Sequence, residues 1–139
     1  MNKRIIITAS VLGMLAVIAG AFGAHGLTAL ISADQLNVWH TAVQYQFYHV
    51  FALLFLSTFT HSKNKLINAS YYFFTIGIIF FSGSLYLLAC SDLLKLTKII
   101  PVIGPITPIG GLLFILGWLM LAIAAFRKED SGRKKTRSA

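Results

Sequence analysis

The charged residues of this chain divide it into four long uncharged segments, and this division constrains the fold more than any other feature. The segments are 5–33, 35–62, 66–91 and 99–126. A helix needs roughly 20 apolar residues to cross about 30 Å of hydrocarbon, and each segment is long enough to supply them. The composition agrees, since 57% of the residues are hydrophobic and only 12% are charged. The sequence therefore predicts an integral membrane protein rather than a soluble domain.

We expect each segment to form one transmembrane helix of a compact all-α bundle. The predicted spans are residues 5–24, 39–60, 67–90 and 108–126. Together they make one transmembrane domain, 1–126, followed by a basic tail, 127–139, that we expect to be disordered. The N-terminal segment also imitates a cleavable secretory signal, but its apolar stretch is long for a signal core. We therefore expect it to be kept as the first span.

The positions of lysine and arginine predict the orientation of the bundle. With four spans, the N-terminus, the loop 61–66 and the C-terminal tail share one side of the membrane. That side holds all of the twelve lysines and arginines except Lys95 and Lys98. Because cytoplasmic segments carry the excess of these residues, we expect both termini in the cytoplasm. The net charge of +8 is then mostly a topology signal, and no folded basic domain is present to bind nucleic acid.

Small residues recur at helical spacing in three of the predicted spans. In lipid, helices associate through small residues that let their backbones approach closely. These residues are Ala9, Gly13, Ala16, Gly20 and Ala24 in the first span, Ser70, Gly77 and Ser84 in the third, and Gly110, Gly117 and Ala124 in the fourth. We interpret them as contact faces for neighbouring helices, within one chain or between copies of it.

Three prolines, Pro101, Pro105 and Pro108, precede the fourth span. Each removes a backbone N–H donor and disfavours helix in the residue before it. We therefore expect an irregular connection over 99–106, which is either a surface loop or a re-entrant segment. Thr107 suits the N-cap of the last helix, with Pro108 at its first helical position.

The second predicted span contains HTAVQYQFYHVFALL, residues 40–54, and its first half is unusually polar. On a helical wheel, all of these polar side chains except Gln46 fall on one half of the helix. Such a face cannot contact lipid without unsatisfied donors and acceptors, so it should face the bundle interior or a pocket. One interpretation is a ligand, proton or metal site lined by Gln44, Tyr45, Tyr48 and His49. The other, which we favour from the sequence, is a hydrogen-bond network that fixes helix packing.

A second set of polar residues gathers on the membrane side opposite the termini. These residues are His25, Asp34, His40, Cys90 and Asp92. They could bind zinc or copper, and His25 with His40 could flank a haem. However, their spacing matches no known metal motif, and polar residues collect naturally at membrane interfaces. We therefore expect no metal and no cofactor, and a single cysteine excludes an internal disulfide.

Four segments, distributed over all four predicted spans, resemble a known family. They are GAFGAHGL from residue 20, TAVQYQFYHVFALL at 41–54, FSGSLYLLA at 81–89 and ITPIGGLLFILGW at 106–118. They are similar to the signature segments of the YgdD-like family of small bacterial inner-membrane proteins, which is described as a domain of unknown function. The resemblance implies a multi-pass protein with four spans in the inner membrane. It implies no catalytic residue.

The sequence leads us to expect a non-enzymatic protein that acts through helix association, in membrane integrity or in the assembly of partner proteins. Its partners would be the lipid bilayer and either a second copy or another membrane protein. The alternative is a protein that binds a small molecule or cofactor, such as haem, a quinone or a lipid, on the polar face of the second helix. A transporter is less favoured because the spans carry no acidic relay. An enzyme is less favoured because no paired carboxylates, Ser-His-Asp set or zinc signature is present.

Overall fold

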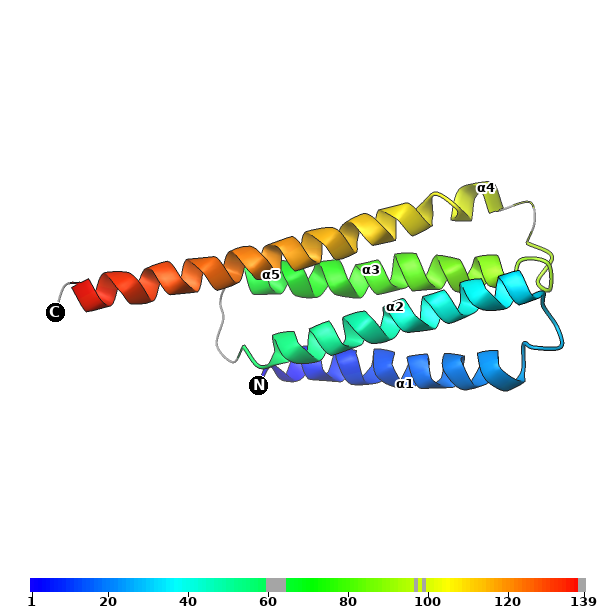
Figure 1. Cartoon of the computed structure of the whole chain (residues 1–139), viewed down its shortest axis with the longest axis horizontal. Coiled ribbons are helices and arrows are strands. Elements are labelled where there is room, and N and C mark those ends of the chain that lie inside the picture. Colours follow the sequence, from blue (N-terminus) through cyan, green and yellow to red (C-terminus); the bar gives the residue numbers. More distant parts are fainter. Residues whose placement is uncertain (60–64, 97, 99, 138–139) are drawn as a thin grey trace.

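The computed structural model describes residues 1–59, 65–96, 98 and 100–137, and of 128–137 it describes the backbone alone. Within these residues the fold is all helical, which confirms the predicted class. The helices are α1 Lys3–His25, α2 Ala33–Ser57, α3 Lys65–Ala89, α4 Ile100–Ile103 and α5 Ile106–Arg137. The four long helices lie side by side, and both termini lie at the same end of the bundle (Figure 1).

Three segments of the described chain are long and apolar enough to cross a membrane. They are Lys3–His25, Lys65–Ala89 and Ile100–Arg127. Helix α2 is outside this set because the polar residues of its first half lower its mean hydropathy. The case for α2 as a fourth span therefore depends on the partners of its polar groups, which are described below.

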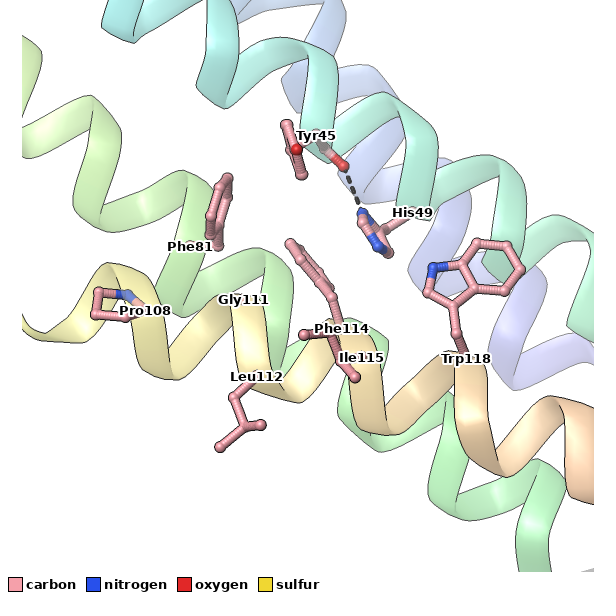
Figure 2. A pocket seen from close by; sticks show the side chains of 9 residues that line it. All are labelled: Tyr45, His49, Phe81, Pro108, Gly111, Leu112, Phe114, Ile115 and Trp118. Carbon is pink, nitrogen blue, oxygen red and sulfur yellow. Dashed lines mark hydrogen bonds between the residues drawn. The ribbon is translucent and has the colours of Figure 1, made fainter.

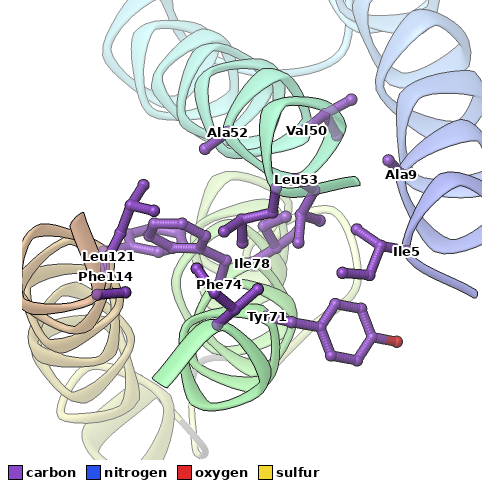
Figure 3. Packing of buried hydrophobic residues seen from close by; sticks show 13 residues of the cluster. Ile5, Ala9, Val50, Ala52, Leu53, Tyr71, Phe74, Ile78, Phe114 and Leu121 are labelled. Atoms are coloured by element: carbon purple, nitrogen blue, oxygen red, sulfur yellow. The ribbon is translucent and has the colours of Figure 1, made fainter. Parts of the chain in front are cut away.

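The long helices pack in the order α1, α2, α3 and α5, so that each helix contacts the next (Figure 1). Their inward side chains form one apolar cluster to which all four contribute. Figure 3 shows this cluster, in which Ile5 of α1, Leu53 of α2, Phe74 of α3 and Phe114 of α5 are buried. The core therefore lies along the line of four helices and fixes the position of α2 between α1 and α3.

A stripe of small residues on α1 faces α2. A Cβ atom added at Gly13 would lie 3.3 Å from Val50 Cγ1, and one at Gly20 would lie 3.6 Å from Val43 Cγ1. Two further members of the stripe are fully buried, namely Ala9 and Ala16. Ala24 differs, because its side chain is exposed beside the end of the helix. Most of the stripe is therefore covered within the chain.

Small residues also allow α3 and α5 to approach closely. Gly77 is covered by the ring of Phe114, and Gly117 is covered by the ring of Phe74. A methyl group at Gly110 would overlap the backbone of α3. The remaining small residues singled out on these helices are buried as well, and they are Ser70, Ser84 and Ala124. This interface is also occupied within one chain.

The start of α2 differs from the sequence expectation, because the helix begins at Ala33 rather than near residue 39. Ser32 and Gln35 form a capping box that starts the helix early. The backbone N–H of Gln35 donates to Ser32 Oγ at 3.2 Å, and the backbone N–H of Ser32 donates to Gln35 Oε1 at 3.0 Å. The link between α1 and α2 is correspondingly short.

The segment before α5 is also more regular than expected. Residues 100–103 form the helical turn α4, and residue 99 lies outside the described residues. Helix α5 then begins at Ile106, so Thr107 is not its N-cap and Pro108 is its third residue. Proline is tolerated there because the first four N–H groups of a helix have no intrahelical acceptor. The Thr107 hydroxyl instead forms a hydrogen bond with Ser84 Oγ at 2.7 Å.

At its other end, α5 continues to Arg137, whereas the sequence led us to expect a disordered tail from residue 127. Lysine, arginine and glutamate are favourable helix formers. An existing helix also extends into such a sequence without a new nucleation step. Residues 127–137 therefore prolong α5 beyond the other helices (Figure 1).

Candidate ligand pocket between α2 and α5

Gln46 of α2 joins three helices. Its side chain is buried, its Nε2 donates to the Leu12 carbonyl of α1 at 2.8 Å, and its Oε1 accepts from the Tyr86 hydroxyl of α3 at 2.8 Å. On the helical wheel Gln46 is the one polar residue outside the polar half. The structure explains this, because α2 has neighbours on two sides and Gln46 faces both of them. Both polar atoms of this buried amide are therefore satisfied inside the bundle.

Two further hydrogen bonds tie α2 to its neighbours. The Trp39 indole N–H donates to the Ala19 carbonyl of α1 at 2.9 Å. The Ser82 hydroxyl of α3 donates to the Ala42 carbonyl of α2 at 2.9 Å. A side-chain donor without an acceptor would cost free energy in lipid, and both of these donors have an acceptor inside the bundle.

These hydrogen bonds do not enclose the whole polar half of α2. His40, Gln44 and Tyr48 are exposed, so the expectation that this face as a whole points into the bundle or a pocket is wrong for these residues. Of that face only His49 is buried.

A pocket lies on the other side of α2, toward α5. Its volume is about 510 Å³. In the described chain α2 and α5 are not backbone neighbours, and aromatic rings only partly fill the space between them. The residues that line the pocket are Tyr45, His49, Phe81, Pro108, Gly111, Leu112, Phe114, Ile115 and Trp118 (Figure 2). The walls are thus mostly aromatic and aliphatic.

His49 is the buried polar residue of this wall, with only 5% of its surface exposed. Its Nδ1 lies 2.8 Å from the Tyr45 carbonyl oxygen, and its ring stacks on Phe114 with centroids 3.4 Å apart. A carbonyl oxygen only accepts hydrogen bonds, so in the neutral imidazole the proton is on Nδ1. The Nε2 atom then carries a lone pair and can accept a hydrogen bond.

That Nε2 atom is buried and has no hydrogen-bond partner among the residues that the structure describes. Leaving a buried acceptor unsatisfied costs about 1–3 kcal/mol, so such atoms are rare without a reason. The ring of Trp118 lies near His49, with centroids 6.3 Å apart, and its indole nitrogen is on the side that faces His49 (Figure 2). The polar groups of the lining side chains are thus the Nε2 acceptor of His49, the indole N–H donor of Trp118 and the hydroxyl of Tyr45, within otherwise apolar walls, a composition typical of small-molecule sites.

The structure brings together two of the four residues singled out on the polar face. Tyr45 and His49 line the pocket, and the ring of Tyr45 lies 4.6 Å from that of Phe81. Gln44 and Tyr48 are exposed and do not line it. The sequence did not point to the rings contributed by α3 and α5, because aromatic residues are common in such helices and their spacing carries no distinct signal.

The histidines proposed as weak metal ligands lie away from this pocket. His25 ends α1 and His40 is on the first half of α2, and both are exposed. Asp92 accepts a hydrogen bond from Gln35 Nε2 at 2.8 Å. Within the described ranges, no three His, Cys, Asp or Glu residues are grouped closely enough to hold a metal ion.

Comparison with known proteins places the chain in a family. Residues 19–111 match the family described as "Protein of unknown function (DUF423)". This chain belongs to the DUF423 family. The DUF423 protein is 46% identical to UPF0382 membrane protein SAB0533 of Staphylococcus aureus (strain bovine RF122 / ET3-1), over 90% of this chain and 97% of that protein. It is 41% identical to UPF0382 membrane protein YwdK of Bacillus subtilis (strain 168), over 90% of this chain and 98% of that protein.

These relatives identify the DUF423 protein as a membrane protein, and their names state no activity, substrate or ligand. No solved structure matches the chain significantly. The sequence-based resemblance is thus confirmed at the level of a small membrane-protein family of unknown function. Its narrower YgdD-like designation stays a prediction.

Proposed function

We propose that this DUF423 protein crosses the bacterial inner membrane four times, with both termini in the cytoplasm. Helix α2 has 25 residues, which is enough for a span. Its buried amide at Gln46 is satisfied by α1 and α3, so crossing the membrane exposes no unpaired group there. The two termini at one end of the bundle and the distribution of lysine and arginine support the same topology.

We further propose that the protein acts without catalysis, by binding a lipid-soluble small molecule in the pocket between α2 and α5. The observation that carries this proposal is the buried and unpartnered Nε2 of His49 beside an otherwise apolar pocket. A ligand hydroxyl that donates to Nε2 would offset the cost of that unsatisfied acceptor. The aromatic walls favour a flat ring next to the hydroxyl.

The ligand has to move a side chain of the pocket wall, because Nε2 itself is covered. Trp118 is suited to this, since 49% of its surface is exposed. Once displaced, its indole N–H can donate to a second oxygen of the ligand. The ligand class that fits best is therefore a flat, apolar ring compound that carries a hydroxyl group, which includes the reduced form of a lipid quinone.

The packing of the small residues favours binding over association as the main role. Apart from the exposed Ala24, the stripe on α1 and the small residues between α3 and α5 are covered by helices of the same chain. They are therefore not free to join copies of the protein. Of the small-residue stripes and the pocket, the pocket is therefore the one that is open to a partner.

Helix association remains the second candidate, through a different surface. In the described chain α1 packs mainly against α2, with side-chain contacts to α3 near its start, and its outer side exposes large apolar residues. They are Ile7, Val11, Met14, Leu15, Val17 and Ile18. A second copy or another membrane protein could cover this face and so contribute to membrane integrity or assembly. A Val17→Trp variant should then lose the higher-mass species seen by native mass spectrometry, whereas unchanged mass would exclude this face.

The binding proposal is tested with 1-naphthol and 1-methoxynaphthalene, in which a methyl group replaces the hydroxyl hydrogen and removes the donor. Binding to the detergent-purified protein is followed by quenching of tryptophan fluorescence. We expect 1-naphthol to bind about tenfold more tightly, as one hydrogen bond to a buried acceptor predicts. In His49→Phe, which keeps a stacked ring, that preference should vanish.

A second variant separates loss of the site from loss of the fold. A Cβ added at Gly111 has its nearest contact at 3.8 Å, so Gly111→Leu should fold and fill the pocket. We expect it to bind neither probe. Gly83→Leu is the matched control, because a Cβ there meets nothing within 4 Å. The proposal would be contradicted if both probes bound to Gly111→Leu as tightly as they bind to the wild type.

A further inference from the structure

The guanidinium of Arg4 is held between α1 and α3 at the end of the bundle where the termini lie. Its Nη1 donates to the Tyr72 hydroxyl at 3.3 Å, and its Nη2 donates to Asn68 Oδ1 at 3.5 Å. Its Cζ lies 4.8 Å from the centroid of the Tyr71 ring. All of these partners are neutral. These partners hold the Arg4 side chain in place, but none of them carries a negative charge to balance its positive charge.

No carboxylate within the described side chains pairs with Arg4. The whole chain has four acidic residues, and Asp34 and Asp92 lie at the opposite end of the bundle. The other two, Glu129 and Asp130, belong to α5, which is not a neighbour of α1 in the described chain. A guanidinium has five N–H donors, and two hydrogen bonds leave donors for a further partner. That partner should carry negative charge.

A second cation extends the same surface. Lys65 is exposed at the start of α3 and precedes Asn68 by three residues and Tyr72 by seven. Residues at this spacing share one face of a helix. The two partners of Arg4 are thus in line with another positive charge, and the surface combines two cations with a hydroxyl and an amide.

The surface continues into an apolar stripe. Ile7 and Val11 follow Arg4 by three and seven residues on α1, and both are exposed. A free phosphate ion would make no use of this stripe, whereas the acyl chains of a lipid would lie against it. The planar guanidinium matches phosphate oxygens in a two-pronged geometry, and basic groups between membrane helices attract anionic head groups.

We propose that Arg4, Lys65, Asn68 and Tyr72 form a binding site for the phosphate group of an anionic phospholipid. The site rests on the proposed topology, which puts this end of the bundle at the inner surface of the membrane. It is independent of the pocket between α2 and α5. Lipid bound here would hold α1 against α3 at the level of the head groups, where side-chain hydrogen bonds connect the two helices.

The test is native mass spectrometry of the full chain in mild detergent, with added phosphatidylglycerol or phosphatidylcholine of identical acyl chains. We expect one phosphatidylglycerol molecule to bind at low lipid concentration and phosphatidylcholine to bind at least about tenfold more weakly. In Arg4→Lys the net charge is unchanged, but the forked donor and the stacked ring contact are lost. This variant should bind phosphatidylglycerol about tenfold more weakly.

Lys98→Gln is the control, since it removes a charge at the opposite end and should bind like the wild type. Circular dichroism melts show whether Arg4→Lys keeps its fold, and Tyr72→Phe supplies a milder second variant that should bind with intermediate affinity. Wild-type binding by Arg4→Lys, or equal binding of the two lipids, would overturn the proposal. Displacement of the lipid by inorganic phosphate would identify the free ion as the ligand and overturn the lipid assignment. Because the assay uses detergent, its outcome does not depend on the topology.

Discussion

Tyr86 of α3 donates its hydroxyl hydrogen to Oε1 of Gln46 on α2 at 2.8 Å, while Nε2 of the same amide donates to the Leu12 carbonyl of α1. Three helices thus meet at one buried glutamine. This arrangement explains how α2 can be a membrane helix although, among the four long helices, it lacks a stretch apolar enough to qualify as a candidate span.

Replacing Gln46 by leucine should destabilise the bundle. The change leaves the half-buried Tyr86 hydroxyl without its acceptor, and we expect a loss of about 1–2 kcal/mol in the free energy of unfolding. Thermal unfolding in detergent, followed by circular dichroism, measures it. The double variant with Tyr86→Phe should recover part of the loss, because it removes the orphaned hydroxyl. Gln44→Leu, on the exposed side of the same helix, should have little effect, and equal losses in both variants would contradict the assignment.

Gly110 and Gly111 are neighbours in sequence but should respond oppositely to alanine. A methyl group at Gly110 overlaps the backbone of Phe81, so Gly110→Ala must force α3 and α5 apart and should cost about 1–3 kcal/mol of stability. At Gly111 the nearest atom lies 3.8 Å from the added Cβ. Gly111→Ala should therefore gain roughly 0.5–1 kcal/mol, because glycine is unfavourable inside a helix. The unfolding temperatures of the two variants, measured in parallel, test the close approach of α3 and α5.

The proposed topology predicts which positions a membrane-impermeant thiol reagent can reach. In a Cys90→Ser background, Lys98→Cys should be labelled from outside intact cells. Lys3→Cys and Arg127→Cys should react only after the membrane is permeabilised. Labelling of Arg127→Cys but not Lys3→Cys in intact cells would mean an odd number of spans. That result would contradict the proposal that α2 crosses the membrane.

Much of the fold could be predicted from the sequence, because long uncharged segments permit few structures other than membrane helices. The start of α2 was missed although its signal is present, since Ser-Ala-Asp-Gln at residues 32–35 is a capping-box pattern. The turn α4 was missed for another reason. Proline disfavours the helix interior but is accepted in a first turn, and the sequence alone does not say which case holds.

The candidate site was harder to predict. A helical wheel shows which residues share a face, but it does not show how many neighbours a helix has. Gln46 lies off the polar face of the wheel, yet α1 and α3 meet on its side of α2. Gln44 and Tyr48 share a face with His49 but remain exposed. Only the arrangement of α3 and α5 determines that rings such as Phe114 leave the His49 Nε2 atom covered and unpartnered.

The central claim is that the pocket between α2 and α5 holds a small molecule, and native mass spectrometry of the protein extracted from its own membrane tests it most directly. We predict that the wild type retains one small molecule per chain, that Arg4→Lys retains it too, and that Gly111→Leu lacks it. The Arg4→Lys result distinguishes this ligand from a phospholipid held at Arg4. A wild-type spectrum with no added mass, or the same added mass in Gly111→Leu, would contradict the claim.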